Sequence, residues 1–233
     1  MHFDPPLKKG RLIRRYNRFL ADIELENGTI VIAHCPNSGR MTGCAMPNST
    51  VYIAPALNTN RKLKYTWELT FLHKNNWVGV NTLRTNRIVE EALLMRRIPE
   101  LAEYSSLQRE VKYGEKSRID FLLTTDRDAK IFVEVKNVSL VENGIARFPD
   151  AVTTRGQKHL KELMNMVGMG HRAVLFFLVN RQDAHSFAAA ELIDPVYAQL
   201  FGKAIKSGVE ILVYQTKADN HNITVGKSLP LNI

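Results

Sequence analysis

Two apolar, strand-like runs that each contain a carboxylate constrain this sequence more than any other feature. The runs are residues 117–121 and 133–136, and the polar segment between them is typical of a turn. If the turn is centred on Arg127, Asp120 lies directly opposite Glu134, because the two residue numbers average to 127. Side chains opposite each other on antiparallel strands lie only about 4.5–5.5 Å apart at Cβ. The sequence therefore predicts a hairpin with two adjacent carboxylates.

The same hairpin brings a lysine to the carboxylates. Glu134 and Lys136 point to one face of their strand, because side chains alternate with a period of two. Ionised groups in apolar runs are costly unless they pair or bind a ligand. Asp120 and Glu134 are therefore candidate ligands for Mg²⁺ or Mn²⁺, with Lys136 as a candidate for positioning an attacking water. A cross-strand salt bridge of Lys136 with either carboxylate fits the same pattern, and residue types alone leave both interpretations open.

The charge balance favours a phosphate-rich partner. The chain has 32 Lys and Arg against 23 Asp and Glu, a net charge of +9. We expect DNA as the partner, bound non-specifically through its backbone. The longest fully apolar run, residues 173–179, is too short to span a bilayer, so we expect no membrane contact. The N-terminal residues lack the apolar core of a signal peptide, and we expect a cytoplasmic protein.

The sequence also bears on the two cysteines and on the oligomeric state. Cys35 and Cys44 have no metal-ligand spacing with other Cys or His residues, so we expect free, buried thiols. The sequence does not determine the oligomeric state, and a homodimer is one of the states that it allows.

Basic side chains gather in three segments that could contact DNA. Residues 8–18 carry six Lys or Arg, interleaved with Tyr16 and Phe19, which we expect to be core residues. The polar loop 36–40 could offer backbone N–H groups to a phosphate or be a simple tight turn. Basic groups at the start of a helix near 153–167 suit phosphate binding, although a solvated basic face would look alike. The candidate DNA-binding residues are Arg14, Arg15, Arg18, Asn37, Arg40, Arg155 and Lys158.

The pattern of expected helices and strands changes after Asn81, which predicts two domains, 1–81 and 82–233. The first consists of short strand-like runs and polar turns, including the hairpin signal Asn27-Gly28, and suits an OB-like β-barrel of five strands. The second alternates helices and strands, which is typical of an α/β domain with helices on the faces of its sheet. The expected strands are 19–25, 29–33, 51–54, 63–72, 77–80, 108–113, 118–124, 131–138, 142–148, 173–179 and 209–215, and the expected helices are 83–97, 153–167 and 194–206.

The first expected helix supplies a third acidic candidate. Ile88, Ala92, Leu93 and Met95 form its apolar stripe, and Glu91 lies at the margin of that stripe. A glutamate at such a margin can reach across a cleft and join Asp120 and Glu134 as a metal ligand. The alternative is an ordinary solvated glutamate on a helix surface.

Several motifs resemble known families. The Asp120, Glu134 and Lys136 set resembles the acidic-x-Lys centre of the PD-(D/E)xK nucleases, although Ile119 stands where that motif has proline. The whole chain resembles the sugar fermentation stimulation protein (SfsA) family. The motifs that carry this resemblance are Arg18-Phe19, residues 34–41, Asn81-Thr82, Asn86-Arg87, residues 117–121, Glu134-Val135-Lys136, residues 148–151 and residues 154–160.

The resemblance implies a specific set of properties. It implies an OB-like domain joined to a nuclease-like α/β domain with a mixed sheet, non-specific DNA binding, and a regulatory link to the use of sugars, especially maltose. It also implies that Glu91 is the helix-borne glutamate of the nuclease centre, and that Gln157 with either Lys161 or Lys158 has the helical Gln/Lys role of related nucleases.

Three functional hypotheses follow from the sequence. The protein binds DNA and acts by occupancy, with the nuclease-like domain as scaffold. Alternatively, it is a Mg²⁺-dependent nuclease in which Asp120, Glu134 and Glu91 bind metal and Lys136 positions water. The third hypothesis is a module for another phosphorylated ligand such as a nucleotide, but the chain has no Gly-rich phosphate loop of the usual forms.

Overall fold

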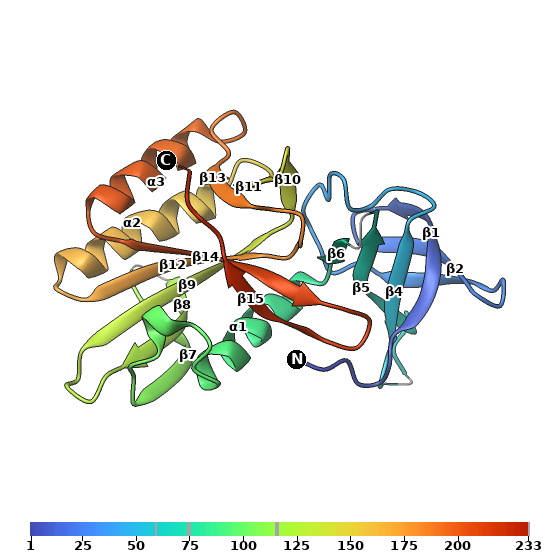
Figure 1. Ribbon diagram of the computed structural model, residues 1–233, viewed down its shortest axis with the longest axis horizontal. Coiled ribbons are helices and arrows are strands. Elements are labelled where there is room, and N and C mark those ends of the chain that lie inside the picture. The colour runs from blue at the N-terminus through green and yellow to red at the C-terminus, as the bar shows by residue number, and fades with distance from the viewer. Residues whose placement is uncertain (59, 74–75, 115–116, 233) are drawn as a thin grey trace.

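The chain folds into a barrel and an α/β domain that lie side by side along the long axis of the molecule (Figure 1). The structure is a computed structural model that describes residues 1–58, 60–73, 76–114 and 117–232. The OB-like barrel followed by a mixed-sheet α/β domain confirms the predicted fold class.

The barrel is a sheet with the strand order β3-β2-β1-β4-β5-β6, closed by a parallel pairing of β3 with β5. Its core contains the fully buried side chains of Leu12, Ile23, Ile53 and Trp67. The strands are β1 (Lys8–Tyr16), β2 (Leu20–Leu25), β3 (Ile30–His34), β4 (Thr50–Pro55), β5 (Tyr65–Leu72) and β6 (Asn76–Gly79).

The barrel differs from the sequence expectation in two respects. The β1 strand was not predicted, because its run of lysines and arginines masks the alternation around the buried Leu12. The prediction that Phe19 is a core residue is wrong, since its side chain is 45% exposed. Phe19 ends the three-residue turn between β1 and β2, where side chains project from the barrel.

The second domain is built on a six-stranded mixed sheet with the order β15-β14-β12-β9-β8-β7. The central strands β9, β12 and β14 are parallel, and the remaining neighbours pair antiparallel. The strands are β7 (Ser106–Tyr113), β8 (Ser117–Thr124), β9 (Lys130–Val138), β12 (Arg172–Val179), β14 (Glu210–Ala218) and β15 (Ile223–Ser228). A small second sheet contains β10 (Leu140–Glu142), β11 (Ile145–Phe148) and β13 (Ser186–Ala189).

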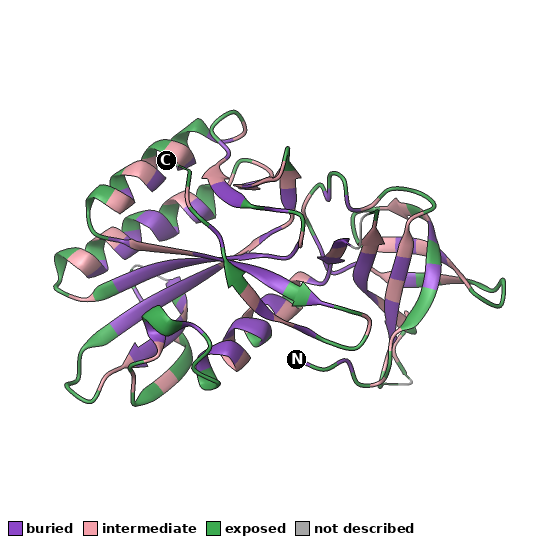
Figure 2. Cartoon of the chain, viewed as in Figure 1, coloured by how far each residue is buried: buried purple, intermediate pink, exposed green. Residues whose placement is uncertain are grey.

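Helices cover both faces of the large sheet. The α1 helix (Thr85–Leu94) packs on one face, and α2 (Thr154–Gly168) and α3 (Pro195–Lys206) pack on the other (Figure 1). Alternate residues of the central strands pack against the helices on the two faces of the sheet. These strands are therefore almost wholly buried, while each helix has one exposed side (Figure 2). Two short 3₁₀ helices, η1 (Thr82–Arg84) and η2 (Pro99–Leu101), flank α1.

The predicted hairpin register is confirmed. Phe121 pairs with Val133, and Leu123 pairs with Ile131, so the two strands are centred on Arg127 as expected. Three elements differ from the prediction. The single strand predicted at 142–148 is instead part of the hairpin of β10 and β11, which turns at Asn143-Gly144, and strands β13 and β15 were not foreseen.

The two domains are joined by backbone as well as side-chain contacts. The Gly79 amide donates to the Asn180 carbonyl at 2.8 Å, and Val78 forms an isolated bridge with Arg181. The first residues of the chain cross to the second domain, where the Phe3 amide donates to the His221 carbonyl. The junction is therefore hydrogen-bonded at several separate points.

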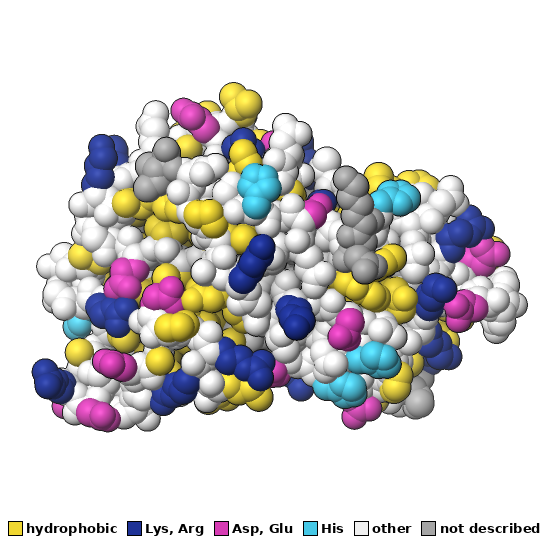
Figure 3. Space-filling model, in the orientation of Figure 1, with side chains coloured by type: hydrophobic (Ala, Val, Ile, Leu, Met, Phe, Trp, Pro, Cys, Tyr) yellow, Lys and Arg dark blue, Asp and Glu magenta, His cyan; other side chains and the backbone are white. Residues whose placement is uncertain are grey.

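The distribution of surface charge, the apolarity of the helices and the state of the two cysteines can be compared with the sequence expectations. Lys and Arg side chains alternate with acidic ones across both domains on the face shown in Figure 3. None of the described helices combines the length and apolarity needed to cross a bilayer. Cys35 and Cys44 are buried and free, which confirms the expectation for the two thiols.

Candidate metal and nucleic-acid site

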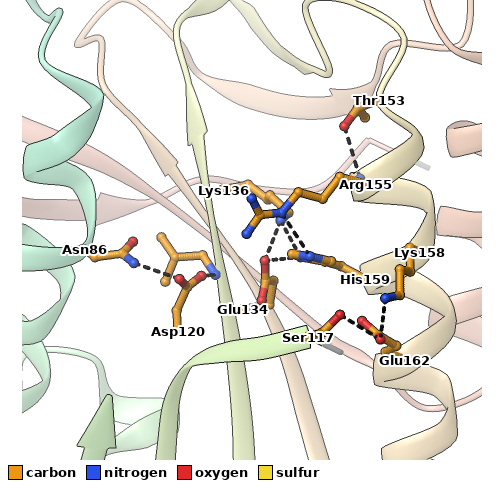
Figure 4. A network of polar contacts seen from close by, with 12 residues as sticks. Asn86, Ser117, Asp120, Glu134, Lys136, Thr153, Arg155, Lys158, His159 and Glu162 are labelled. Atoms are coloured by element: carbon orange, nitrogen blue, oxygen red, sulfur yellow. Dashed lines mark hydrogen bonds and ion pairs between the residues drawn. The ribbon is translucent and has the colours of Figure 1, made fainter. Parts of the chain in front are cut away.

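Asp120 lies where β8 and β9 stop pairing. Beyond the Phe121–Val133 pair, its carboxylate accepts hydrogen bonds from the Val135 amide and from Asn86 Nδ2 on α1, both at 2.7 Å (Figure 4). Burial, and then the nearby charge of Glu134, raise the pKa of Asp120 to about 6. An acidic group with a raised pKa in such a position is characteristic of functional sites.

Glu134 is the most enclosed group of the predicted trio, with a residue exposure of 3%. Its Oε1 atom accepts a hydrogen bond from Lys136 Nζ at 2.5 Å, and His159 Nδ1 is a second hydrogen-bonding partner of the same oxygen (Figure 4). Burial opposes ionisation, but Lys136 and His159 outweigh it and lower the pKa of Glu134 below its usual value. The predicted salt bridge and the predicted cluster of two carboxylates and a lysine are thus present together.

A histidine on α2 completes the cluster. His159 is buried, and its Nδ1 atom lies 3.0 Å from Lys136 Nζ as well as against Glu134. On the other side of the ring, Arg155 Nε donates to His159 Nε2 at 3.3 Å. Because Nε2 accepts this bond, the ring proton is assigned to Nδ1, from which it is donated to Glu134.

The residues present fit a two-carboxylate cation site. Glu134 Oε2 is buried and, within the described residues, lacks a hydrogen-bond partner, so a strong acceptor is left available. The described residues contain no group of three or more His, Cys, Asp or Glu side chains arranged for a metal. Asp120 and Glu134 therefore suit a cation such as Mg²⁺, which binds through one or two carboxylates and keeps several waters.

Glu91 is not brought to this site. Its carboxylate lies 2.6 Å from the amino nitrogen of Met1 in an ion pair. The helix buries Val89 together with Ile88, whereas Met95 lies beyond its end and is 54% exposed. Ile88, Ala92 and Leu93 are thus buried as predicted, Met95 is not part of the stripe, and α1 brings Asn86 rather than Glu91 to Asp120.

Two predicted residues of α2 also have partners elsewhere. Gln157 Nε2 donates to both carboxylate oxygens of Asp194, the N-cap residue of α3, at 3.0 and 3.1 Å. Lys158 lies 3.5 Å from Glu162 in an ion pair one helical turn away. Neither contact involves Asp120 or Glu134.

An interdomain cleft of about 890 Å³ lies beside the cluster, and Lys136 forms part of its wall. One side of the cleft belongs to the barrel and the other to Thr82, residues 136–140, residues 147–153 and Arg155. Among the residues that the structure describes, its lining contains six basic side chains and a single carboxylate, that of Asp150. The six basic residues are Arg15, Arg18, Arg40, Lys136, Arg147 and Arg155.

The loop 37–40 forms the barrel side of the cleft and is held firmly. Arg15 Nη2 donates to the carbonyls of Asn37 and Gly39 at 2.7 and 3.1 Å. The buried Asn37 side chain donates to the Val80 carbonyl and accepts from the Gly39 amide. The Arg40 amide donates to Asp150 Oδ2 at 3.1 Å, which ties the loop to the second domain. Asn37 and Arg15 thus shape the loop, whereas the Arg40 side chain faces the cleft.

Arg14 lies outside the cleft. It is exposed on the barrel, where its guanidinium pairs with Asp22 at 2.7 Å and stacks over the Tyr16 ring. Sequence reasoning left Asn86, Arg147 and His159 out of the candidate set, although His159 shares a helix face with Arg155 at a spacing of four residues. Asn86 lies in one of the motifs that carry the family resemblance, but neither it nor Arg147 has a spacing that predicts its contacts, because packing between distant segments brings them to the site.

Family comparisons cover nearly the whole chain. The family model described as "SfsA N-terminal OB domain" matches residues 13–80, and that described as "Sugar fermentation stimulation protein RE domain" matches residues 83–222. A "Sugar fermentation stimulation protein homolog" from Shewanella sp. (strain MR-4) is 49% identical over 234 residues, with full coverage of both chains. A homolog of the same name from Geotalea daltonii is 52% identical over 231 residues, which is 99% of each chain.

A solved structure agrees with these sequence matches. "The structure of Pyrococcus Furiosus SfsA in complex with Ca2+" superimposes with a TM-score of 0.88 at 28% identity, covering 100% of this chain and 98% of that one. The agreement extends over the barrel and the α/β domain together. The chain therefore belongs to the sugar fermentation stimulation protein (SfsA) family.

Proposed function

We propose that this protein binds DNA without sequence preference in the interdomain cleft, beside a divalent-cation site formed by Asp120 and Glu134. The observation that carries the proposal is the composition of the cleft, where the described lining residues include six basic side chains against one carboxylate. Basic groups contributed by both domains favour a polyanionic ligand, and contacts to phosphates do not depend on base sequence. Arg18, Arg40 and Arg155 are the main proposed phosphate contacts.

The cation site lies next to that proposed path of DNA. Lys136 lines the cleft and bonds to Glu134, so the carboxylates and the phosphate-binding surface are adjacent. A bound divalent cation would polarise a phosphate oxygen and lower the pKa of a coordinated water. The relative from Pyrococcus furiosus was solved with Ca²⁺, which supports a divalent site in the family, and we propose Mg²⁺ or Mn²⁺ for this chain.

A second candidate function is hydrolysis of DNA phosphodiester bonds. The specific observation in its favour is the Lys136 ammonium, held between Glu134 and His159 at the wall of the cleft. There it can orient a water for attack on phosphorus and offset negative charge as the ester P–O bond breaks. His159 holds Glu134 and Lys136 in place through its ring, and Arg155 holds the ring.

The family name supports a further part of the proposal, a regulatory link to sugar use. We propose maltose as the sugar, as the sequence resemblance implies. DNA binding would supply such a link by occupancy. A deletion strain should grow poorly on maltose, with growth restored by the wild-type gene but not by an Arg18→Ala/Arg155→Ala gene. Equal growth of all strains would contradict this regulatory role.

The test of DNA binding compares cleft and non-cleft arginines. Fluorescence anisotropy with two unrelated duplexes should give similar affinities that fall steeply as salt increases. Arg18→Ala/Arg155→Ala should bind at least tenfold more weakly. Arg14→Ala, which removes an exposed arginine outside the cleft, should change affinity less than twofold. Binding insensitive to salt, or equal losses in both variants, would overturn the assignment of the cleft.

Catalysis is tested separately with metal. Single- and double-stranded DNA are incubated with Mg²⁺ or Mn²⁺ and wild-type protein, Asp120→Ala or Lys136→Ala. Metal-dependent cleavage by the wild type and its loss by about 10²-fold or more in both variants would support the nuclease. Absence of cleavage by the wild type, with intact DNA binding, would leave DNA binding as the function and reject hydrolysis.

A further inference from the structure

A second basic cavity lies at the junction of the barrel and α1, outside the interdomain cleft. It has a volume of about 370 Å³, and its lining includes His34, Arg61, Glu68, Arg84 and Arg87. We call it the Arg61 pocket. It forms where the end of β3 pairs with the start of β5 and where residues 81–87 lead from the barrel into the second domain.

One arginine of the pocket is a structural partner of a buried carboxylate. Glu68 is 2% exposed, and its two oxygens accept from Arg84 Nη2 at 2.9 Å and Nε at 3.2 Å. Asn81 Nδ2 also donates to Glu68 at 2.9 Å. The charge of Glu68 is therefore balanced by Arg84, which is what a buried carboxylate requires.

The other two arginines have no such explanation. Arg61 Nη1 donates to the neutral hydroxyl of Thr66 at 2.8 Å. Arg87 is exposed and, in the described part of the chain, has neither a hydrogen-bonding nor an ionic partner. The pocket thus has an excess of two positive charges. Burial, and then the charge of Arg61, lower the pKa of His34, which is consistent with a positive potential in the pocket.

The Arg61 pocket and the interdomain cleft flank one short segment. Thr82 lines the cleft, whereas the next residue, Leu83, lines the pocket and is 75% exposed. In the first turn of α1, Asn86 donates to Asp120, while Arg87 lines the pocket. A chain of phosphates that occupies the cleft would therefore need to cross only this segment to reach the pocket.

We propose that the Arg61 pocket is a second binding site for the phosphate backbone of the same nucleic acid, with Arg61 and Arg87 as its phosphate contacts. Guanidinium groups bind phosphate oxygens through directed hydrogen bonds, and Arg84 is preorganised in the wall by Glu68. This inference rests on the proposed DNA binding and extends it, because it adds a contact that short ligands confined to the cleft cannot make.

The test removes two charges from the pocket and two from a remote surface. Arg61→Ala/Arg87→Ala is compared with Lys203→Ala/Lys206→Ala, whose exposed lysines lie in the last turn of α3, far from the barrel (Figure 1). Anisotropy is measured over a salt series with single strands of about 5 and about 25 nucleotides. For the long strand, loss of two phosphate contacts should make the slope of log K against log salt shallower by about 1.4 units and weaken binding about tenfold.

The short strand and the control variant make the outcome decisive. The pocket variant should bind the short strand as the wild type does, and the Lys203/Lys206 variant should match the wild type for both strands. Arg61→Gln/Arg87→Gln, which retains more of each side chain, should repeat the result if the alanine variant is unstable. Wild-type binding with no slope change in either pocket variant would overturn the pocket and leave the cleft intact, whereas no wild-type binding would overturn the proposed function itself.

A direct readout of the pocket comes from His34. Its ring signal in an NMR spectrum, identified by its loss in His34→Gln, should shift when the long strand is added and stay in place with the short strand. A shift of equal size with both strands, or no shift with either, would contradict a site reached only by longer nucleic acid.

Discussion

The Asp120 carboxylate accepts a hydrogen bond of 2.7 Å from the backbone amide of Val135, the residue that follows Glu134. The bond forms just beyond the last paired residues of β8 and β9. It holds the Asp120 side chain beside the second carboxylate and favours its ionised form. Burial, and then the charge of Glu134, outweigh this bond and raise the pKa of Asp120 to about 6.

The stability of the metal-free protein should depend on pH through Asp120. Because its pKa rises from 3.8 to about 6 on folding, the contribution of this group is fully present below pH 3.8 and is lost as pH rises through 6. The loss is at most about 3 kcal/mol. Denaturant unfolding in EDTA from pH 4 to pH 7 should show this loss in wild type relative to Asp120→Asn. Parallel pH profiles for the two proteins would contradict it.

Cation binding should show the opposite dependence on pH. A cation binds the ionised carboxylate, so its affinity should fall about tenfold for each pH unit below 6. Isothermal titration calorimetry with Mn²⁺ at pH 5, 6 and 7.5 measures this dependence. Asp120→Asn should abolish measurable binding, whereas Glu91→Gln should leave it within about twofold, because Glu91 pairs with the Met1 amino group. Equal losses of Mn²⁺ affinity in both variants would mean that Glu91 is a ligand of the cation after all.

Asn86→Ala should weaken cation binding without removing a ligand. The Asn86 hydrogen bond favours the ionised form of Asp120, so its loss should raise the pKa of Asp120 further above 6. The affinity for Mn²⁺ at pH 6 should fall about three- to tenfold, and the difference from wild type should shrink at pH 8. A difference independent of pH would mean that Asn86 acts in another way.

His159→Ala should destabilise the protein and disorder the cluster. The substitution removes a buried side chain that bonds Glu134 and contacts Lys136, which we expect to cost about 1–3 kcal/mol in the free energy of unfolding. Lys161→Ala, an exposed position on the same helix, should change it by less than about 0.5 kcal/mol. Chemical denaturation measures both, and similar values for the two variants would contradict a role for His159 in the cluster.

Gly39 and Asp150 should be energetically coupled across the domain junction. A Cβ atom at residue 39 would collide with Asp150 Oδ2, so Gly39→Ala should destabilise the protein by about 1–3 kcal/mol. In an Asp150→Ala background the same substitution should cost less, because the colliding oxygen is gone. A double-mutant cycle measures the coupling. Additive effects would show that the loop does not pack on Asp150.

The sequence by itself determined the features that depend on neighbours along the chain. Strand alternation and the polar turn predicted the hairpin register, and hence that Asp120, Glu134 and Lys136 lie near one another. The change from short strands to alternating helices and strands after Asn81 predicted a barrel followed by an α/β domain. These inferences succeed because hairpin register and side-chain alternation are set by local geometry.

Only the tertiary structure decided which distant side chains join that hairpin. The α1 helix packs on the sheet through Ile88, Val89, Ala92 and Leu93, and this brings Asn86 to Asp120 while Glu91 meets Met1. Likewise, packing of α2 on the opposite face brings His159 to Glu134, and contact between the domains creates the cleft. Periodicity assigns residues to a helix face, but the partner of that face is set by the packing of segments tens of residues apart.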